Sequence, residues 1–252
     1  MKRSQPLPIP KCREFSWDEY KKIPIVESGE PLIPLSTSNL LVTYPFYAKM
    51  GIANAIPECF VREGVFEKLH QVAELIPVGK KLVVLDGWRP FSVQQHLFDT
   101  LINILKKSFP THPEHHLHEK AKSLVSPPSS DIKAPSPHLT GGSVDVTLCD
   151  DMGRFLNMGT DFDEASQFSW TDALESESSL DREAQENRRI LYNAMSEVGF
   201  TNLPSEWWHY DFGNQLWAYR NGAQQAEYGV TRPRDIIKQW ESEILENRFI
   251  YI

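Results

Sequence analysis

Apolar residues recur at helical spacing in three long stretches of the chain. The first, residues 61–76, places apolar residues on one helical face at intervals of three and four, which predicts an amphipathic helix. This face comprises Val65, Leu69, Val72 and Ile76. The second stretch, residues 91–107, predicts another helix, in which Ser92 and Gln95 have the spacing of a capping box. Its expected apolar face comprises Val93, Leu97, Leu101, Ile104 and Leu105. The third, residues 182–200, has a similar stripe and a glycine suited to a C-terminal cap.

Shorter apolar runs predict strands. LVVL, residues 82–85, is ended by an Asp-Gly pair, and GGSVDVTLCD, residues 141–150, is entered through two glycines. In the second run alternate residues face opposite sides of a sheet, so Asp145 lies on the face away from Val144 and Val146. WWHYDF, residues 207–212, is also strand-like.

Helices and strands alternate irregularly, and hairpin-type turns are few. This pattern favours an α+β fold in which helices pack on a small, largely antiparallel sheet. The length of 252 residues suits one large domain, and we assign a single catalytic domain to residues 1–252. Within it we expect an extended N-terminal segment (1–35), a surface excursion rich in proline, serine and histidine (108–137), and a C-terminal helical extension (230–252).

Composition narrows the function. The formal net charge of -8 argues against nucleic acid as the main partner, and no apolar run of membrane-spanning length is present. The basic start MKRSQPLPIPKCREFSW lacks the apolar stretch of a signal peptide, so we expect a cytoplasmic protein. Three distant cysteines, Cys12, Cys59 and Cys149, contain no CxxC pair, which disfavours a disulfide framework or a cysteine-built zinc site.

Eight histidines are present, and most have a simple structural interpretation. Four lie in the excursion, where a solvated loop or short helix competes with adventitious metal binding. These are His112, His115, His116 and His118. His70 and His96 adjoin the apolar faces of predicted helices, which favours packing. His138 and His209 remain as candidates for chemistry.

His138 stands in a turn seven residues before Asp145, and Gly141-Gly142 between them allow the chain to reverse. Histidine nitrogen and carboxylate oxygen suit Zn²⁺, and a catalytic zinc needs a third protein ligand, for which His209 is the best candidate. By spacing alone, the pattern favours polar residues satisfied at a strand entry over a metal site.

Four motifs, in order, resemble the zinc D-alanyl-D-alanine peptidases. SPHLTGGSVD matches S-x-H-x-x-G-x-A-x-D, with Ser143 in place of alanine, and EWWH matches E-x-x-H. DGWRP and MGTDFD resemble segments of the vancomycin-resistance-type dipeptidase branch. The resemblance extends from about residue 35 to about residue 229. The excursion is longer than the family needs, which leaves substrate size open, and the serine-for-alanine exchange suggests little effect.

The resemblance implies a role for each matched residue. One Zn²⁺ per chain would be bound by His138, Asp145 and His209, in the central cleft of the fold. Glu206 would be the general base, and Arg89 would contact the reacting carbonyl. The remaining two matches bind substrate: Asp163 would hold the free amino group, and Ser136 would assist. Alternatives from the residues alone are a turn-bracing arginine, a solvated loop aspartate and a surface glutamate.

The expected function is therefore zinc-dependent hydrolysis of D-alanyl-D-alanine, or a similar short D-amino-acid dipeptide, by a metallopeptidase of cell-wall metabolism. The partner is a small dipeptide, with no nucleic acid or membrane. The alternatives are a zinc DD-carboxypeptidase or endopeptidase acting on cell-wall peptides, and a non-catalytic zinc-containing binding module.

The segment SEWWHYDFG adds a structural condition. In a regular strand Glu206 and His209 point to opposite faces, whereas His209 shares its face with Asp211. If Glu206 and His209 serve one metal ion, the chain must bend near residues 204–206. We therefore predict a bend there.

Overall fold

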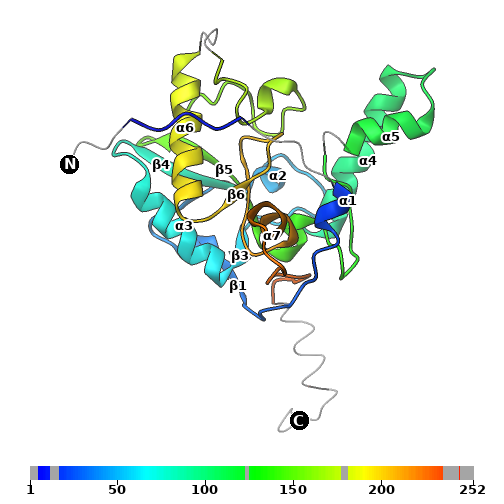
Figure 1. Cartoon of the computed structure of the whole chain (residues 1–252), viewed down its shortest axis with the longest axis horizontal. Helices are drawn as coiled ribbons and strands as arrows, with labels where there is room; N and C mark the ends of the chain where they lie inside the picture. Colours follow the sequence, from blue (N-terminus) through cyan, green and yellow to red (C-terminus); the bar gives the residue numbers. More distant parts are fainter. Residues whose placement is uncertain (1–4, 12–16, 123–124, 177–180, 235–243, 245–252) are drawn as a thin grey trace.

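A central five-stranded sheet organises the molecule, which we describe from a computed structural model covering residues 5–11, 17–122, 125–176, 181–234 and 244 (Figure 1). The strand order is β2-β4-β5-β7-β6, and only the β2–β4 pair is parallel. The strands are β2 (Val42–Thr43), β4 (Lys80–Asp86), β5 (Ser143–Asp150), β6 (Thr201–Asn202) and β7 (His209–Asp211). A second, two-stranded antiparallel sheet pairs β1 (Leu32–Pro34) with β3 (Phe60–Arg62). The predicted α+β fold with a largely antiparallel sheet is confirmed.

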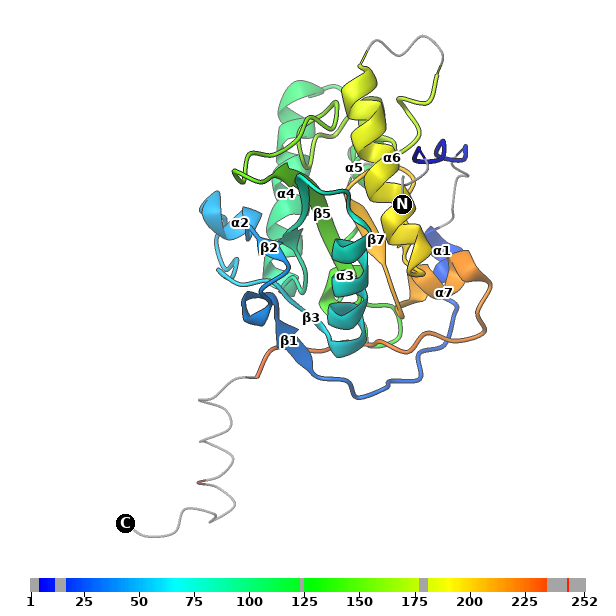
Figure 2. The same ribbon diagram turned by 90° about the vertical axis from the view of Figure 1, so that its left-hand side faces the viewer.

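Two helices cover one face of this sheet and enclose the main core. They are α3 (Glu63–Leu75) and α6 (Arg182–Glu197), which lie side by side (Figures 1 and 2). Their apolar stripes pack against Val144, Val146 and Leu148 of β5, as the sequence pattern predicts. Asp181 caps α6 by accepting a hydrogen bond from the Ala184 amide, 2.9 Å away. The opposite face of β5 is therefore left for the functional site.

The second predicted helix, α4 (Phe91–Ser108), differs in detail from its sequence pattern. It begins directly after Pro90, so Ser92 lies inside the first turn and the expected capping box with Gln95 is wrong. The buried face is also shifted, because the helix packs its last turns on α5 (Glu114–Lys122) instead of on the sheet. The buried residues are Val93, Gln94, Phe98, Ile102 and Leu105, whereas Ile104 is exposed.

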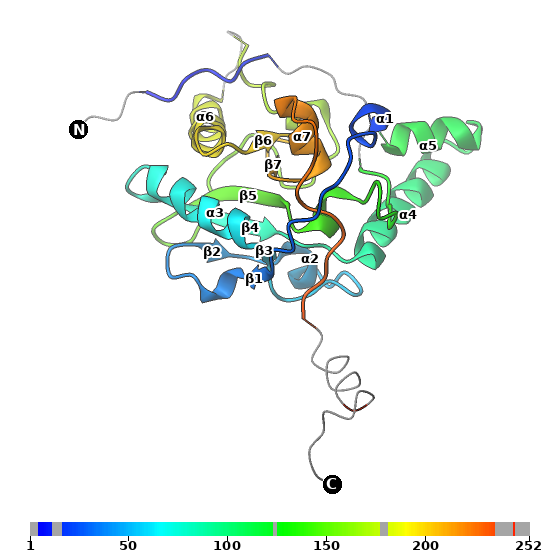
Figure 3. The same cartoon turned by 60° about the horizontal axis from the view of Figure 1, so that its bottom comes forward.

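The excursion supplies α5, which forms a helical hairpin with α4, and it carries exposed histidines. α4 and α5 share a small apolar seam, and both stand to one side of the sheet (Figure 3). His112, His115 and His116 are exposed, and His96 on α4 is exposed instead of packed as expected. His70 on α3 is half-buried, as predicted, with its Nε2 2.9 Å from the Ser38 hydroxyl oxygen.

The remaining elements are short. They are the α-helices α1 (Trp17–Tyr20), α2 (Phe46–Lys49) and α7 (Gln215–Asn221), and the 3₁₀ helices η1 (Leu35–Thr37), η2 (Pro137–Thr140) and η3 (Gln167–Ser169). The N-terminal segment includes α1 and β1 as well as extended chain that crosses the domain, with a bridge between Ile25 and Ala226. The predicted helix after residue 230 lies almost entirely outside the described residues, and the domain boundaries stay a prediction.

Two further expectations concern cysteines and membranes. Cys59 and Cys149 are buried and free, and Cys12 lies outside the described residues. No helix in the described part of the chain combines the length and the apolarity that crossing a bilayer requires.

A buried arginine fixes the loop between β5 and α6. Arg188 is 2% exposed, and its guanidinium donates to the carbonyl oxygens of Met158 (2.6 Å), Trp170 (2.8 Å) and Phe168 (2.8 Å). Burial lowers its pKa to about 10, so the group remains charged at neutral pH. This cation holds both ends of the loop that carries Asp163.

Replacing Arg188 by alanine should therefore destabilise the protein strongly. Three carbonyl oxygens would lose a charged donor at once, and we expect a loss of about 2–4 kcal/mol in the free energy of unfolding. Urea denaturation measures this value. Arg182→Ala, on the exposed side of the same helix, is the control and should change stability by less than about 0.5 kcal/mol. Equal effects of the two variants would contradict this interpretation.

Candidate metal centre

Two strands place a carboxylate and an imidazole opposite each other. Asp145 of β5 and His209 of β7 are direct cross-strand partners in the antiparallel ladder. Directly opposed residues of such a pair project to the same face. Both side chains point away from the face covered by α3 and α6, and both are buried. The register alone thus brings the two groups together.

His138 reaches the same point from a turn. It lies in η2, which ends at Gly141 with a left-handed φ of 71°. A side chain on Gly141 would come within 2.5 Å of Leu32, and one on Gly142 within 2.5 Å of the Phe212 carbonyl oxygen. The two glycines therefore let the chain reverse tightly, as the sequence predicts, and carry His138 back over β5.

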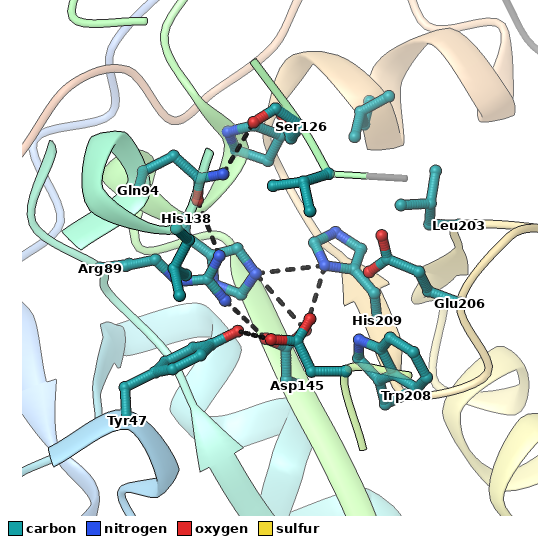
Figure 4. Close-up of a pocket in the computed structure, with 15 residues that line it drawn as sticks. Tyr47, Arg89, Gln94, Ser126, His138, Asp145, Leu203, Glu206, Trp208 and His209 are labelled. Atoms are coloured by element: carbon teal, nitrogen blue, oxygen red, sulfur yellow. Dashed lines mark hydrogen bonds and ion pairs between the residues drawn. The ribbon is translucent and has the colours of Figure 1, made fainter. Parts of the chain in front are cut away.

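The three side chains converge on one point (Figure 4). Nε2 of His138 lies 3.2 Å from Nδ1 of His209, and Oδ1 of Asp145 lies 3.4 Å and 3.2 Å from these two nitrogens. One donor atom of each residue lies within 4.8 Å of the others, and this is the only such trio among the described residues. Two nitrogens and one oxygen suit Zn²⁺ and leave a coordination position open. The set fits a catalytic metal ion.

Each converging side chain is also held from behind. Nδ1 of His138 lies 2.7 Å from the Gly87 carbonyl oxygen, and Nε2 of His209 lies 3.1 Å from both oxygens of Asp211. These acceptors favour a proton on the rear nitrogen and leave the front nitrogen free to bind a metal. Burial alone would raise the pKa of Asp145, but the neighbouring His138, His209 and Arg89 hold it well below its ordinary value.

Asp211 belongs to a buried polar chain that the sequence did not reveal. It is the second residue after His209 on β7 and accepts hydrogen bonds from the Ser143 hydroxyl and the Asn214 amide, both at 2.7 Å. Ser143 and Asp211 are direct cross-strand partners. We expected serine in place of alanine at this position to have little effect, but that expectation did not consider this hydrogen bond, which alanine cannot make. The sequence did indicate that Asp211 shares a strand face with His209, and this could have pointed to Asp211 as a partner of the histidine.

Arg89 lies beside the three converging side chains and is held by three hydrogen bonds. Its Nε donates to Asp86 (2.6 Å), and its two terminal nitrogens donate to Gln94 (2.7 Å) and Asp145 (2.8 Å). The guanidinium also stacks 4.7 Å from the centre of the Tyr47 ring. These bonds use three of the five N–H groups of an arginine, so two remain to meet a ligand in the pocket. The arginine both braces the strand end and lines the pocket.

Glu206 shares this pocket because the chain turns before β7. The Glu206 amide donates to the Leu203 carbonyl (3.0 Å), and the His209 amide donates to the Glu206 carbonyl (3.3 Å). The Asn202 side chain also donates to the carbonyl oxygens of Glu206 (2.9 Å) and His209 (3.0 Å). The predicted bend is confirmed, and the strand begins only at His209. Glu206 and His209 consequently line one pocket.

Desolvation sets the acidity of Glu206. The side chain is half-buried beside Trp208, and burial raises its pKa to about 8. Nearby Asp145 adds to the rise, and nearby His209 opposes it. A carboxyl group with a raised pKa in a cleft is the kind of group that exchanges protons near neutral pH.

Asp163 and Tyr47 form the next part of the pocket wall. The Tyr47 hydroxyl donates to Asp163 at 3.1 Å, and Asp163 has a left-handed φ of 64°, which turns its carboxylate into the pocket. Although the residue as a whole is exposed, desolvation of its carboxylate raises the pKa of Asp163 to about 6. Nearby Arg89 opposes this rise. Asp163 therefore lies in an exposed loop, as the alternative interpretation held, and its carboxylate also lines the pocket.

Ser136 does not join the other predicted site residues. It is buried, its hydroxyl oxygen accepts from the Ser129 amide at 2.7 Å, and the hydroxyl contacts the Pro127 carbonyl at 3.4 Å. It is absent from the lining of the described pocket. These contacts join the end of the excursion to residues 127–129 within it. A role for Ser136 in substrate binding stays a prediction.

His138, Asp145 and His209 are buried and converge on one point, and the Glu206 carboxylate lines the same pocket. This arrangement is typical of the centre of a metal-dependent hydrolase. Comparison with family models matches residues 51–227 to the D-Ala-D-Ala dipeptidase family, Peptidase_M15. The chain belongs to this family of zinc metallopeptidases.

Individual relatives agree with this assignment. A D-alanyl-D-alanine dipeptidase of Synechocystis sp. is 30% identical over 229 residues, covering 83% of this chain and 92% of the relative. One of Escherichia coli is 29% identical over 133 residues, covering 53% of this chain and 55% of the relative. The solved structure of VanYB in complex with D-Alanine-D-Alanine is a distant likeness: 17% identity, a TM-score of 0.39, and coverage of 68% of this chain and 81% of that chain.

The raised pKa of Glu206 predicts a pH-dependent stability of the metal-free protein. Its folded pKa of about 8 exceeds its ordinary value of 4.5, so between these pH values the unfolded chain releases a proton that the folded chain retains. The stability of the folded state therefore falls as pH rises through this window. Glu206→Gln removes the effect, so the Tm of E206Q relative to wild type should increase from pH 5 to pH 8 in chelator and then level off.

The control for this series is Glu67→Gln, on the exposed side of α3. It removes one negative charge without changing the pocket. A Tm difference between E206Q and wild type that stays constant from pH 5 to pH 8 would show that Glu206 is not desolvated.

Proposed function

We propose that the chain hydrolyses D-alanyl-D-alanine, or a similar short D-amino-acid dipeptide, to free amino acids. The observation that carries this proposal is a single pocket that includes His138, Asp145 and His209 together with Glu206, Arg89 and Asp163. A pocket that holds a cation and a carboxylate beside the candidate metal ligands suits a small ligand with charges of both signs, such as a free dipeptide.

The residues that would hold the zinc ion are His138, Asp145 and His209. A bound Zn²⁺ lowers the pKa of a coordinated water and polarises a carbonyl group. The buried position of all three residues, and the acceptors behind the two histidines, support this role. Asp145 divides its oxygens, because Oδ1 faces the histidines and Oδ2 accepts from Arg89.

Glu206 would move the proton. Its carboxylate enters the pocket beside His209, and its raised pKa suits a group that takes a proton from water and passes it to the leaving amine. A purely structural metal site needs no such group. This favours an enzyme over the non-catalytic binding module.

Arg89 and Asp163 would orient the dipeptide. The guanidinium of Arg89 retains two N–H groups for the carbonyl oxygen, where negative charge develops during attack. The carboxylate of Asp163, which lines the same pocket, is a partner for the free ammonium of a dipeptide. A substrate that presents both groups is a free dipeptide, which favours dipeptidase over carboxypeptidase activity on longer chains.

Asp211 and Ser143 would act as positioning residues for the metal centre. Asp211 accepts from the rear nitrogen of His209, and Ser143 with Asn214 holds Asp211 in place. The pair thus fixes which imidazole nitrogen faces the metal ion. The cytoplasmic location stays a prediction.

The activity is tested with purified protein of measured zinc content. We expect release of D-alanine from D-Ala-D-Ala, abolished by chelation and restored by Zn²⁺, with much weaker cleavage of a pentapeptide ending in D-Ala-D-Ala. Glu206→Gln should keep the zinc but lose about 10²–10⁴-fold in kcat, the typical contribution of general acid–base catalysis. Activity in verified metal-free protein, or preference for the pentapeptide, would refute the proposal.

The positioning role is tested by zinc affinity, independently of turnover. Asp211→Ala should weaken zinc binding by about 10–100-fold, and Ser143→Ala should have a smaller effect in the same direction. Chelator competition measures the affinity, and the visible spectrum of the Co²⁺-substituted protein reports the ligand geometry. Thr147→Val, a buried position on the same face of β5, is the matched control. Unchanged affinity in Asp211→Ala would remove Asp211 from the metal centre.

A further inference from the structure

The pocket of the metal centre continues into a second hollow. This second pocket shares four residues with the first: Val125, Asp163, Glu206 and Trp208. Beyond them it is bordered by the loop that follows Asp163, by Trp170 and by the end of α5. The two hollows are thus parts of one cleft, and Asp163 and Glu206 stand at their junction.

The outer wall of this cleft comes from the long excursion. Val125 packs against the seam between α4 and α5, where Phe98, Ile102, Leu117 and Ala121 are buried. Its amide donates to the Ala121 carbonyl at 2.9 Å, which holds Val125 beside the end of α5. Lys120, the residue before Ala121 on α5, borders the second pocket only. The hairpin that stands to one side in Figure 3 therefore supplies part of the substrate cleft.

A hydrogen-bonded link ties this wall to the site. The amide nitrogen of Gln94 donates to the Ser126 carbonyl at 2.8 Å, and its amide oxygen accepts from Arg89 at 2.7 Å (Figure 4). Gln94 is 3% exposed. One buried side chain thus fixes the wall relative to Arg89, so the second pocket has a defined position next to the metal centre.

We propose that this second pocket is a subsite for the side chain of the amino-terminal residue of the substrate. The inference rests on the proposed function, because Asp163 at the junction would hold the substrate ammonium. Because Asp163 lines both hollows, we place the side chain on the carbon that bears this ammonium in the hollow beyond Asp163. A methyl group leaves this hollow unfilled, whereas a large side chain occupies it.

The lining indicates the chemistry of that side chain. The indoles of Trp170 and Trp208 and the apolar Val125 provide walls that suit a large apolar or aromatic group. The rest of the lining is largely polar and includes Lys120, Glu164, Ser166, Gln167 and Ser205, so the hollow is apolar along one wall only. An aromatic side chain can pack on the indole wall while the polar residues border its edge. The substrate class is therefore D-dipeptides with a large aromatic first residue, as well as D-Ala-D-Ala.

The zinc-loaded full chain tests this directly with D-Ala-D-Ala and D-Phe-D-Ala. For wild type we expect kcat/KM for D-Phe-D-Ala to lie within tenfold of that for D-Ala-D-Ala. Two variants fill the second pocket: Ala165→Trp and Gln167→Trp, both at lining positions outside the first pocket. Each should lower the ratio of kcat/KM for D-Phe-D-Ala to that for D-Ala-D-Ala by at least tenfold.

The matched control is Ala53→Trp, at an exposed alanine outside both pockets, which should leave the ratio unchanged. If wild type hydrolyses D-Ala-D-Ala but discriminates against D-Phe-D-Ala by more than a hundredfold, or if both filling variants keep the wild-type ratio, the subsite is refuted while the proposed function stands. If neither dipeptide is hydrolysed, the proposed function itself fails.

Discussion

The antiparallel pairing of β5 with β7 is the constraint on which the candidate site depends. Its register sets Asp145 against His209 and, two residues along, Ser143 against Asp211. A slip of one residue would send both functional side chains to the opposite face, into the core beneath α3 and α6. The buried residues Val144, Val146 and Leu148 prevent that slip, because they would be moved out of the core. The hydrophobic core and the metal centre are thus specified by the same strand.

Sequence patterns predicted this arrangement where a local rule applies. Helical spacing located α3 and α6, alternation located β5 and its two faces, and the Gly-Gly pair indicated the reversal after His138. The bend before His209 followed from requiring two residues three apart to serve one ion. These inferences succeed because each depends on neighbours in the chain.

The parts that were missed depend on tertiary contacts. The buried face of α4 is set by α5 and not by the sheet, so its apolar periodicity alone did not identify it. Tyr47 reaches the site from a distant segment through its hydrogen bond to Asp163. Gln94 is near Arg89 in the chain, but its role depends on the distant Ser126 carbonyl to which it also donates. Ser143 was misjudged because its side-chain volume was considered and its hydroxyl was not. Long-range polar contacts of this kind leave little trace in the local sequence.

The link from Arg89 through Gln94 to the Ser126 backbone divides the excursion into two regions with different freedom to vary. Near residues 125–126, a change in chain length would displace a hydrogen-bond acceptor that the buried Gln94 requires. At the tip between α4 and α5, residues 109–113 are exposed, and length there can change at little cost. Relatives with longer or shorter hairpins can therefore keep the same site, and the tip is the natural place to attach a fluorophore or a fused domain.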